Sequence, residues 1–186
     1  MQASEESIAA ATLLQRRRSR NDLLSFVKST KDDFEVAAHH KLIASALQEV
    51  EAGECKRLMI FCPPRHTKSE LATRRFPAWY LGRHPGKQVI SASYNSELAT
   101  DFGREVRNII GTPEYRSIFP ETTLSSDSQA ANRWHTDSGG NYIAAGVGTA
   151  ITGRGADLGI IDDPVKDRQE ADSELIRERI FDWYTS

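Results

Sequence analysis

Apolar positions recur along this chain with two spacings, one typical of helices and one typical of strands. Between residues 34 and 51 they fall at Val36, Ile43, Leu47 and Val50, which is the spacing of one helix face. Helices are predicted over residues 1–30, 34–51, 69–81, 95–110 and 170–186, and strands over residues 58–61, 88–93, 133–135, 141–145 and 156–161. This alternation predicts an α/β fold.

Breaks between these elements are marked by residues that disrupt regular structure. Gly53 is predicted to end one helix, Asn95 or Ser96 to cap another, and Pro77 to bend or end a third. Residues 138–140 are predicted as the turn of a hairpin, and the polar stretch 121–132 as a loop.

The octapeptide from Cys62 to Ser69 lies between a predicted strand and a predicted helix, where the phosphate loop of a nucleoside triphosphatase belongs. In such a loop a lysine reaches the β- and γ-phosphates and a Ser or Thr hydroxyl binds Mg²⁺, and Lys68 and Ser69 fit those roles. Cys62 and Thr67 stand where the usual pattern has glycines. The octapeptide alone is therefore only suggestive.

A second motif is the apolar run that ends in Asp162 and Asp163, read as a short buried strand that leads into two carboxylates. P-loop nucleoside triphosphatases place a Mg²⁺-organising acid at such a strand end. The two motifs are about 90 residues apart, enough for intervening βα units of roughly 30 residues each. Together they predict a P-loop core with a mostly parallel sheet flanked by helices, preceded by a helical N-terminal segment.

Three segments carry a family resemblance. Residues 63–69, 151–157 and 160–164 resemble the ATPase domain of tailed-phage large terminase subunits, over a region from about Phe34 to the last residue. The resemblance implies residues 1–33 as a helical N-terminal segment and 34–186 as an ATPase domain. It also implies ATP and Mg²⁺, with translocation of double-stranded DNA into a prohead. The implied partners are a portal protein and a small terminase subunit, with a homo-oligomeric ring on the prohead. A coupling motif and a nuclease domain, expected after Asp163, are not found, so the domain is expected to be truncated.

Roles follow for individual residues. The loop residues Pro63, Pro64, Arg65, His66 and Thr67 would surround the phosphates together with Lys68 and Ser69. Asp162 is the expected Mg²⁺ carboxylate, alongside Ser69. Asp163 occupies the position where many relatives carry a water-activating Glu, and its side chain is one methylene shorter.

Two arginines compete for the γ-phosphate. Arg65 lies inside the loop and would act in cis, whereas Arg154 lies between Gly153 and Gly155 and suits a finger supplied to a neighbouring subunit. Arg154 also fits an ordinary surface turn. The same glycines give only a weak dinucleotide-binding pattern, because they precede a strand instead of opening a helix.

Residues ahead of the loop are candidates for the nucleobase. In the family that the chain resembles, an element in this position supports the adenine, which points to Phe34, His39 and His40. The alternative is a core position for Phe34 and partly solvated histidines.

Composition sets limits on these interpretations. The chain has 186 residues, 39% hydrophobic and 27% charged, which fits one globular domain. The formal net charge of −2 gives no global basic surface for DNA, so any DNA contact would be local. No apolar run approaches the roughly 20 residues of a membrane span and no signal peptide is recognised, so we expect a cytoplasmic protein, in the host cell if it is phage-encoded. Cys55 and Cys62 predict neither a disulfide nor a zinc site.

Two other functions stay open at this point. One is a helicase-like or kinase-like P-loop enzyme, and the other is a non-catalytic remnant of a prophage protein. Nucleotide binding, turnover and stimulation by DNA separate the three.

Overall fold

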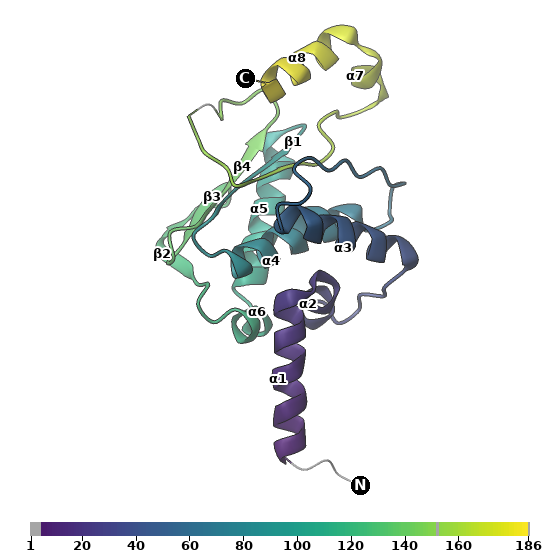
Figure 1. Ribbon diagram of the computed structural model, residues 1–186. Helices are drawn as coiled ribbons and strands as arrows, with labels where there is room; N and C mark the ends of the chain where they lie inside the picture. Colours follow the sequence, from purple (N-terminus) through teal and green to yellow (C-terminus); the bar gives the residue numbers. More distant parts are fainter. Residues whose placement is uncertain (1–4, 152, 186) are drawn as a thin grey trace.

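A five-stranded mixed sheet lies at the centre of the fold (Figure 1). The structure is a computed structural model and describes residues 5–151 and 153–185. Its strands are β1 (Gln88–Ser93), β2 (Leu124–Gln129), β3 (Arg133–Thr136), β4 (Asn141–Gly146) and β5 (Leu158–Ile161), in the spatial order β2-β3-β4-β1-β5. β1 is parallel to β4 and β5, whereas the β2–β3 and β3–β4 pairs are antiparallel. The α/β class is confirmed, but the sheet is mixed because the predicted hairpin forms one side of it.

Helices make up most of the remaining structure. They are α1 (Glu5–Asn21), α2 (Leu23–Thr30), α3 (Ala38–Glu51), the π-helix η1 (Glu70–Arg75), α4 (Phe76–Arg83), α5 (Ser96–Ile110), α6 (Pro113–Ile118), α7 (Arg168–Asp172) and α8 (Glu174–Thr185). Figure 1 shows α1 extending away from the body of the molecule. Within the described residues, no helix combines the length and the apolar character needed to cross a membrane.

The hydrophobic core forms where α5 packs against β1 and β4. Asn95 caps α5 as predicted, since its side chain accepts a hydrogen bond from the backbone N–H of Leu98 at 2.8 Å. Trp134 of β3 and Tyr142 of β4 stack across the sheet with ring centroids 5.0 Å apart, and the Trp134 indole donates to the carbonyl of Gly103. The absence of a side chain at Gly103 permits this close approach of helix to sheet.

The N-terminal helices are tied to this core. Leu23, Phe26 and Val27 of α2 are fully buried in it. Trp79 of α4 donates its indole N–H to the carbonyl of Ser19, at 3.0 Å, near the end of α1. α2 thus shares one hydrophobic cluster with the rest of the chain. The predicted domain boundary at residue 33 stays a prediction.

The predicted strand at residues 58–61 is wrong. The segment has no strand assignment and belongs to none of the five strands. Its side chains still alternate, since Leu58 and Ile60 pack against the core while Met59 and Phe61 are exposed. An apolar run gives the burial pattern of a strand, but strand formation also needs a neighbouring strand to pair with.

Other predicted boundaries also move. Residues 121–132 contain β2 in addition to loop, and α6 follows Thr112 where only the end of a helix was predicted. The helix predicted from residue 34 begins at Ala38, and the helix predicted over 170–186 is divided into α7 and α8. Pro77 does not end its helix, because helical residues continue through it to Arg83; it follows directly on the change from the π-helix η1 to the α-helix α4.

Candidate functional site

The loop from Cys62 to Ser69 leads directly into helix. Helical residues begin at Lys68 and continue through η1 and α4 to Arg83. The first turn therefore presents backbone N–H groups without partners inside the helix, which favours anions. A phosphate group approaching this end would meet both these N–H groups and the Lys68 ammonium.

Backbone strain is concentrated around this loop. Arg65, Thr67 and Asp163 are the non-glycine residues with positive φ in the described chain, at 62°, 57° and 47°. Each such conformation costs about 1–3 kcal/mol and persists only where the surroundings impose it. Thr67 is the most unusual of the three because its side chain is β-branched. It occupies the left-handed conformation for which the usual loop pattern has glycine.

The two sequence motifs meet at the Lys68 ammonium. Its Nζ lies 2.8 Å from Asp163 Oδ1 and 3.3 Å from Asp162 Oδ1, although 95 residues separate Lys68 from Asp163. Burial opposes the charge on Lys68, but the hydrogen bond to Asp163 and the charge of Asp162 outweigh it and raise the pKa of the lysine. Lys68 is therefore protonated at neutral pH and bound to both carboxylates.

The two carboxylates differ in environment. The Asp162 side chain is 6% exposed and the Asp163 side chain 62% exposed. Asp162 accepts a hydrogen bond from the Thr73 hydroxyl at 2.7 Å, and its backbone N–H bonds to Ala92 of β1. The carbonyl of Asp163 accepts from the N–H of Tyr94. Asp162 is thus fixed and buried, whereas Asp163 faces solvent.

Ser69 lies in the first helical turn beside this cluster. Its hydroxyl makes no hydrogen bond with any described residue, so it is available to a ligand. Within the described residues no group of three or more His, Cys, Asp or Glu side chains is arranged to hold a metal ion. Mg²⁺ at nucleotide sites needs only one or two protein oxygens, because phosphate and water supply the rest. The Ser69 hydroxyl and the Asp162 carboxylate fit that requirement in chemical type.

Two of the predicted base-contact residues, His39 and His40, contact the loop at His66 and Thr67. Phe34 and His40 are 8% and 5% exposed, with ring centroids 4.8 Å apart. His40 Nε2 lies 2.5 Å from the Thr67 hydroxyl, and His39 Nε2 lies 3.2 Å from the carbonyl of His66. Burial, followed by the effect of His39, lowers the pKa of His40. Contact with a nucleobase stays a prediction for Phe34, His39 and His40, and the burial of Phe34 and His40 leaves a base little of their surface to touch.

Arg65 and Arg154 occupy different surroundings. Arg65 is exposed on the loop and forms no ion pair with the described residues. Arg154 lines a cavity of about 580 Å³ over β3 and β4, to which no residue of the loop and neither aspartate contributes. The neighbouring Gly153 has φ of 80°, while Thr152 of the same sequence motif lies outside the described residues.

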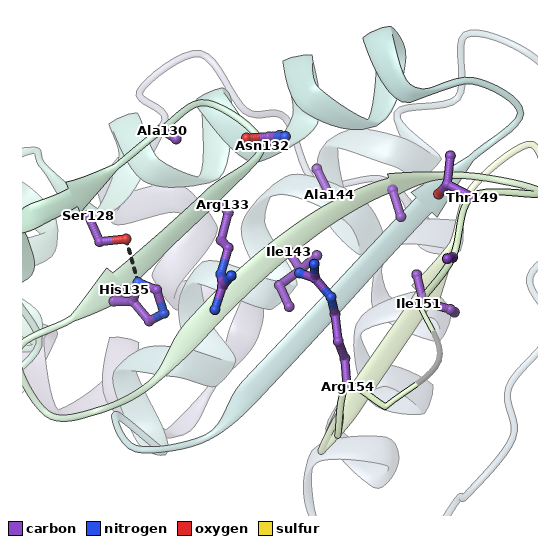
Figure 2. Close-up of a pocket in the computed structure, with 12 residues that line it drawn as sticks. Ser128, Ala130, Asn132, Arg133, His135, Ile143, Ala144, Thr149, Ile151 and Arg154 are labelled. Carbon is purple, nitrogen blue, oxygen red and sulfur yellow. Dashed lines mark hydrogen bonds between the residues drawn. The ribbon is translucent and has the colours of Figure 1, made fainter.

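Figure 2 shows this cavity, with the helices behind the strands and the side chains of Arg133 and Arg154 in front of them. His135 also lines it and is hydrogen-bonded through Nδ1 to the Ser128 hydroxyl. The described lining residues include two arginines and no carboxylate, so the cavity favours an anionic group.

Two contacts at the site were missed at the level of sequence. Thr73 was not predicted to bond Asp162, and His40 was not predicted to bond Thr67. The available signal for Thr73 was a hydroxyl on an otherwise apolar helix face, between Leu71 and Phe76. For His40 the signal was a β-branched residue at a glycine position, which calls for an external support.

Comparison with known proteins gives one family. A family model described as "Terminase large subunit, T4likevirus-type, N-terminal" matches residues 59–186. The match includes the loop from Cys62 to Ser69, the whole sheet and both aspartates. No curated protein and no solved structure matched significantly.

Proposed function

The chain belongs to the terminase large subunit family, and from that membership we propose that it is a Mg²⁺-dependent P-loop ATPase domain of a viral DNA-packaging motor. Membership supports a role in phage DNA packaging. ATP binding, hydrolysis and the powering of DNA translocation into a prohead are the further steps proposed for this chain.

One observation carries the proposal. Lys68 Nζ lies within 3.3 Å of Asp162 and 2.8 Å of Asp163, so a helix N-terminus, a lysine and two carboxylates converge on one point. Phosphoryl transfer requires mainly positioning and charge stabilisation, which are what this arrangement offers. The positive φ values of Arg65, Thr67 and Asp163 support it, since strain of this kind gathers at functional sites.

Each residue then has a task. Lys68 would move from its carboxylates to the β- and γ-phosphates, while backbone N–H groups of residues 65–69 would hold the same phosphates. Ser69 and Asp162 would hold Mg²⁺, which supplies positive charge to the phosphates when bound. The Asp163 carboxylate is exposed and accepts a hydrogen bond from Lys68, and it would orient or deprotonate the attacking water once the lysine has moved.

The arginines divide between two subunits in this proposal. Arg65 lies in the loop and would reach phosphate in cis. Arg154 lines a cavity that the loop does not share, which supports a role toward a neighbouring subunit in a ring. Arg133 lines the same cavity as Arg154 (Figure 2) and would add positive charge to it.

The partners are proposed from the family. They are double-stranded DNA, a portal protein, a small terminase subunit and other copies of this chain, acting in the host cytoplasm. The net charge of −2 supports a local DNA contact over a broad basic surface.

The decisive experiment measures ATP binding by calorimetry and phosphate release with Mg²⁺, for the wild type and Lys68→Ala. Lys87→Ala is the matched control, since Lys87 also pairs with an aspartate, Asp157, at 2.7 Å, but ahead of β1. We expect Lys68→Ala to lose binding and Lys87→Ala to keep it. Unchanged ATP affinity in a folded Lys68→Ala protein would overturn the assignment of the loop.

The aspartates give a second comparison. Asp162→Asn should mainly weaken the dependence on Mg²⁺, whereas Asp163→Asn should leave ATP bound and slow turnover by about 10²–10⁴-fold. Equal loss of binding in both variants would contradict the separate roles. Binding without turnover in the wild type would instead favour a non-catalytic module, and DNA stimulation would favour the motor over an unrelated P-loop enzyme.

A test for Arg154 uses mixed oligomers. In forced oligomers of Arg154→Ala and Lys68→Ala chains, an arginine from the second chain should restore turnover at the intact site of the first. Arginines supplied in trans are worth about 10³–10⁵ in rate. Failure of rescue, together with full activity of Arg154→Ala alone, would leave Arg154 as an ordinary turn residue.

A further inference from the structure

Thr67 has a conformation that its own side chain disfavours. Its φ of 57° is left-handed, and a β-branched residue in that region is an outlier. The residue directly precedes Lys68, so its conformation decides the direction in which the first helical turn and the lysine leave the loop. Its carbonyl also accepts a helical hydrogen bond from the N–H of Leu71 at 3.1 Å. Something outside the loop must hold Thr67 in this shape.

The contact that does so comes from the first turn of α3. His40 Nδ1 accepts a hydrogen bond from the backbone N–H of Ala37 at 3.0 Å, so the proton of the neutral ring lies on Nε2. Nε2 then donates to the Thr67 hydroxyl, 2.5 Å away. That hydroxyl in turn donates to the carbonyl of His66 at 2.7 Å. The hydrogen bonds run in one direction from α3 into the loop.

Two further contacts keep this chain in place. The His40 ring is buried against Phe34, with ring centroids 4.8 Å apart, which fixes its orientation. The carbonyl of His66 lies 3.2 Å from His39 Nε2 in addition to the Thr67 hydroxyl. The lowered pKa of His40, caused first by burial, keeps Nδ1 free of a proton and able to accept from Ala37.

We infer that His40 is a positioning residue, which acts through the Thr67 hydroxyl to hold the phosphate loop in its binding shape without touching the nucleotide. A glycine at position 67 would adopt the same φ without strain and would offer no hydroxyl to hold. The hydrogen bond between His40 and Thr67 therefore maintains the backbone conformation that a glycine would adopt unaided in the usual loop pattern. Because this role presupposes a nucleotide at the loop, it rests on the proposed function.

The test is a double-mutant cycle between the two residues, read out as affinity for a non-hydrolysable ATP analogue with Mg²⁺ by calorimetry. His40→Phe keeps a ring against Phe34 and removes both hydrogen bonds. We expect it to weaken binding roughly tenfold when Thr67 is present, from the lost hydrogen bonds and the unsupported strain. When combined with Thr67→Gly, it should cause less than about a twofold further change, because the loop no longer depends on the contact.

Thr67→Val is the companion variant, since it keeps the β-branch and the strain but lacks the hydroxyl. It should weaken binding about as much as His40→Phe, and more than Thr67→Gly does. A purely structural role of His40 in α3 would reduce affinity equally in the Thr67 and Thr67→Gly proteins, and that result would overturn the inference. Melting curves of each variant confirm that the compared proteins are folded.

Lys68→Ala distinguishes a failure of the proposed nucleotide site from a failure of the positioning role of His40. If Lys68→Ala binds the analogue as the wild type does, the loop is not the nucleotide site and the proposed function fails. If Lys68→Ala abolishes binding while His40→Phe and Thr67→Gly act additively, the proposed function stands and the positioning role of His40 is wrong.

Discussion

Replacing Thr73 by Val tests how strongly the buried aspartate depends on its hydroxyl partner. Thr73 is 1% exposed and Asp162 is 5% exposed, and the Thr73 hydroxyl donates to Asp162 Oδ2 at 2.7 Å. Val has nearly the shape of Thr, so the substitution removes the donor without opening a cavity. A hydrogen bond to a charged group contributes about 1.5–3 kcal/mol, and for a chain of this length that corresponds to a fall in Tm of about 3–12 °C.

Urea unfolding and thermal melting measure this loss, and two variants bracket it. Thr73→Ser keeps the hydroxyl and should retain most of the stability. Thr12→Val is the matched control, because Thr12 is exposed and its hydroxyl donates to the carbonyl of Ile8 in its own helix; we expect a change within about 0.5 kcal/mol.

A double-mutant cycle assigns the effect to the carboxylate charge. In the Asp162→Asn background the hydroxyl faces a neutral amide, so Thr73→Val should cost only about 0.5–1.5 kcal/mol. An unchanged Tm for Thr73→Val, or an equal cost in both backgrounds, would refute the reasoning that the hydroxyl stabilises a buried charge.

Three other outcomes follow from the structure. The pKa of His40 is lowered by burial, so the unfolded chain binds its proton more readily, and stability should fall as the pH drops below the ordinary value of 6.5. In urea titrations, the free energy of unfolding of His40→Gln should depend less on pH than that of the wild type, by at most about 1.4 kcal/mol per pH unit. Parallel plots of this free energy against pH for the two proteins would contradict the prediction. Gly82→Ala should destabilise by about 1–3 kcal/mol because a Cβ there would overlap the ring of Phe119. Gly159→Ala has no atom within 4 Å of the new Cβ and serves as its control; equal melting points would refute the overlap. In buffer without Mg²⁺, Asp163→Asn should raise ATP affinity about two- to fivefold, since an exposed carboxylate no longer holds the loop lysine. Weaker or unchanged binding by calorimetry would contradict that competition.

Local signals predicted the parts of the fold that depend on local chemistry. Asn95 and the apolar stripe after it gave α5, and the turn at residues 138–140 gave the β3–β4 hairpin. Residues 58–61 have the apolar character of a strand, yet pairing depends on a distant partner that the segment itself does not encode. β2 was missed for the opposite reason, since the sequence LSSDSQ is polar and pairs at the edge of the sheet.

The candidate site likewise has a part that was predicted from the sequence and a part that was not. The spacing of motifs placed Lys68 and the two aspartates in one expected site, and the structure brings their side chains together. The contact of His40 with Thr67 depends on how α3 approaches the loop, which residue spacing does not reveal. The sequence showed that Thr67 replaces the glycine of the usual loop pattern, but it did not show that His40 hydrogen-bonds to Thr67.

The aspartates are attached to the sheet through one side only. β5 has four residues and, among the described strands, hydrogen-bonds to β1 alone. The loop lysine, by contrast, begins a helical stretch that packs against α3 and α5. The two halves of the site therefore belong to parts of the molecule with unequal mechanical support. If the hydrogen bonds between β5 and β1 break, the two carboxylates separate from Lys68 while the loop keeps its conformation. Amide hydrogen exchange along β5 would then report the opening of the site before any unfolding of the core.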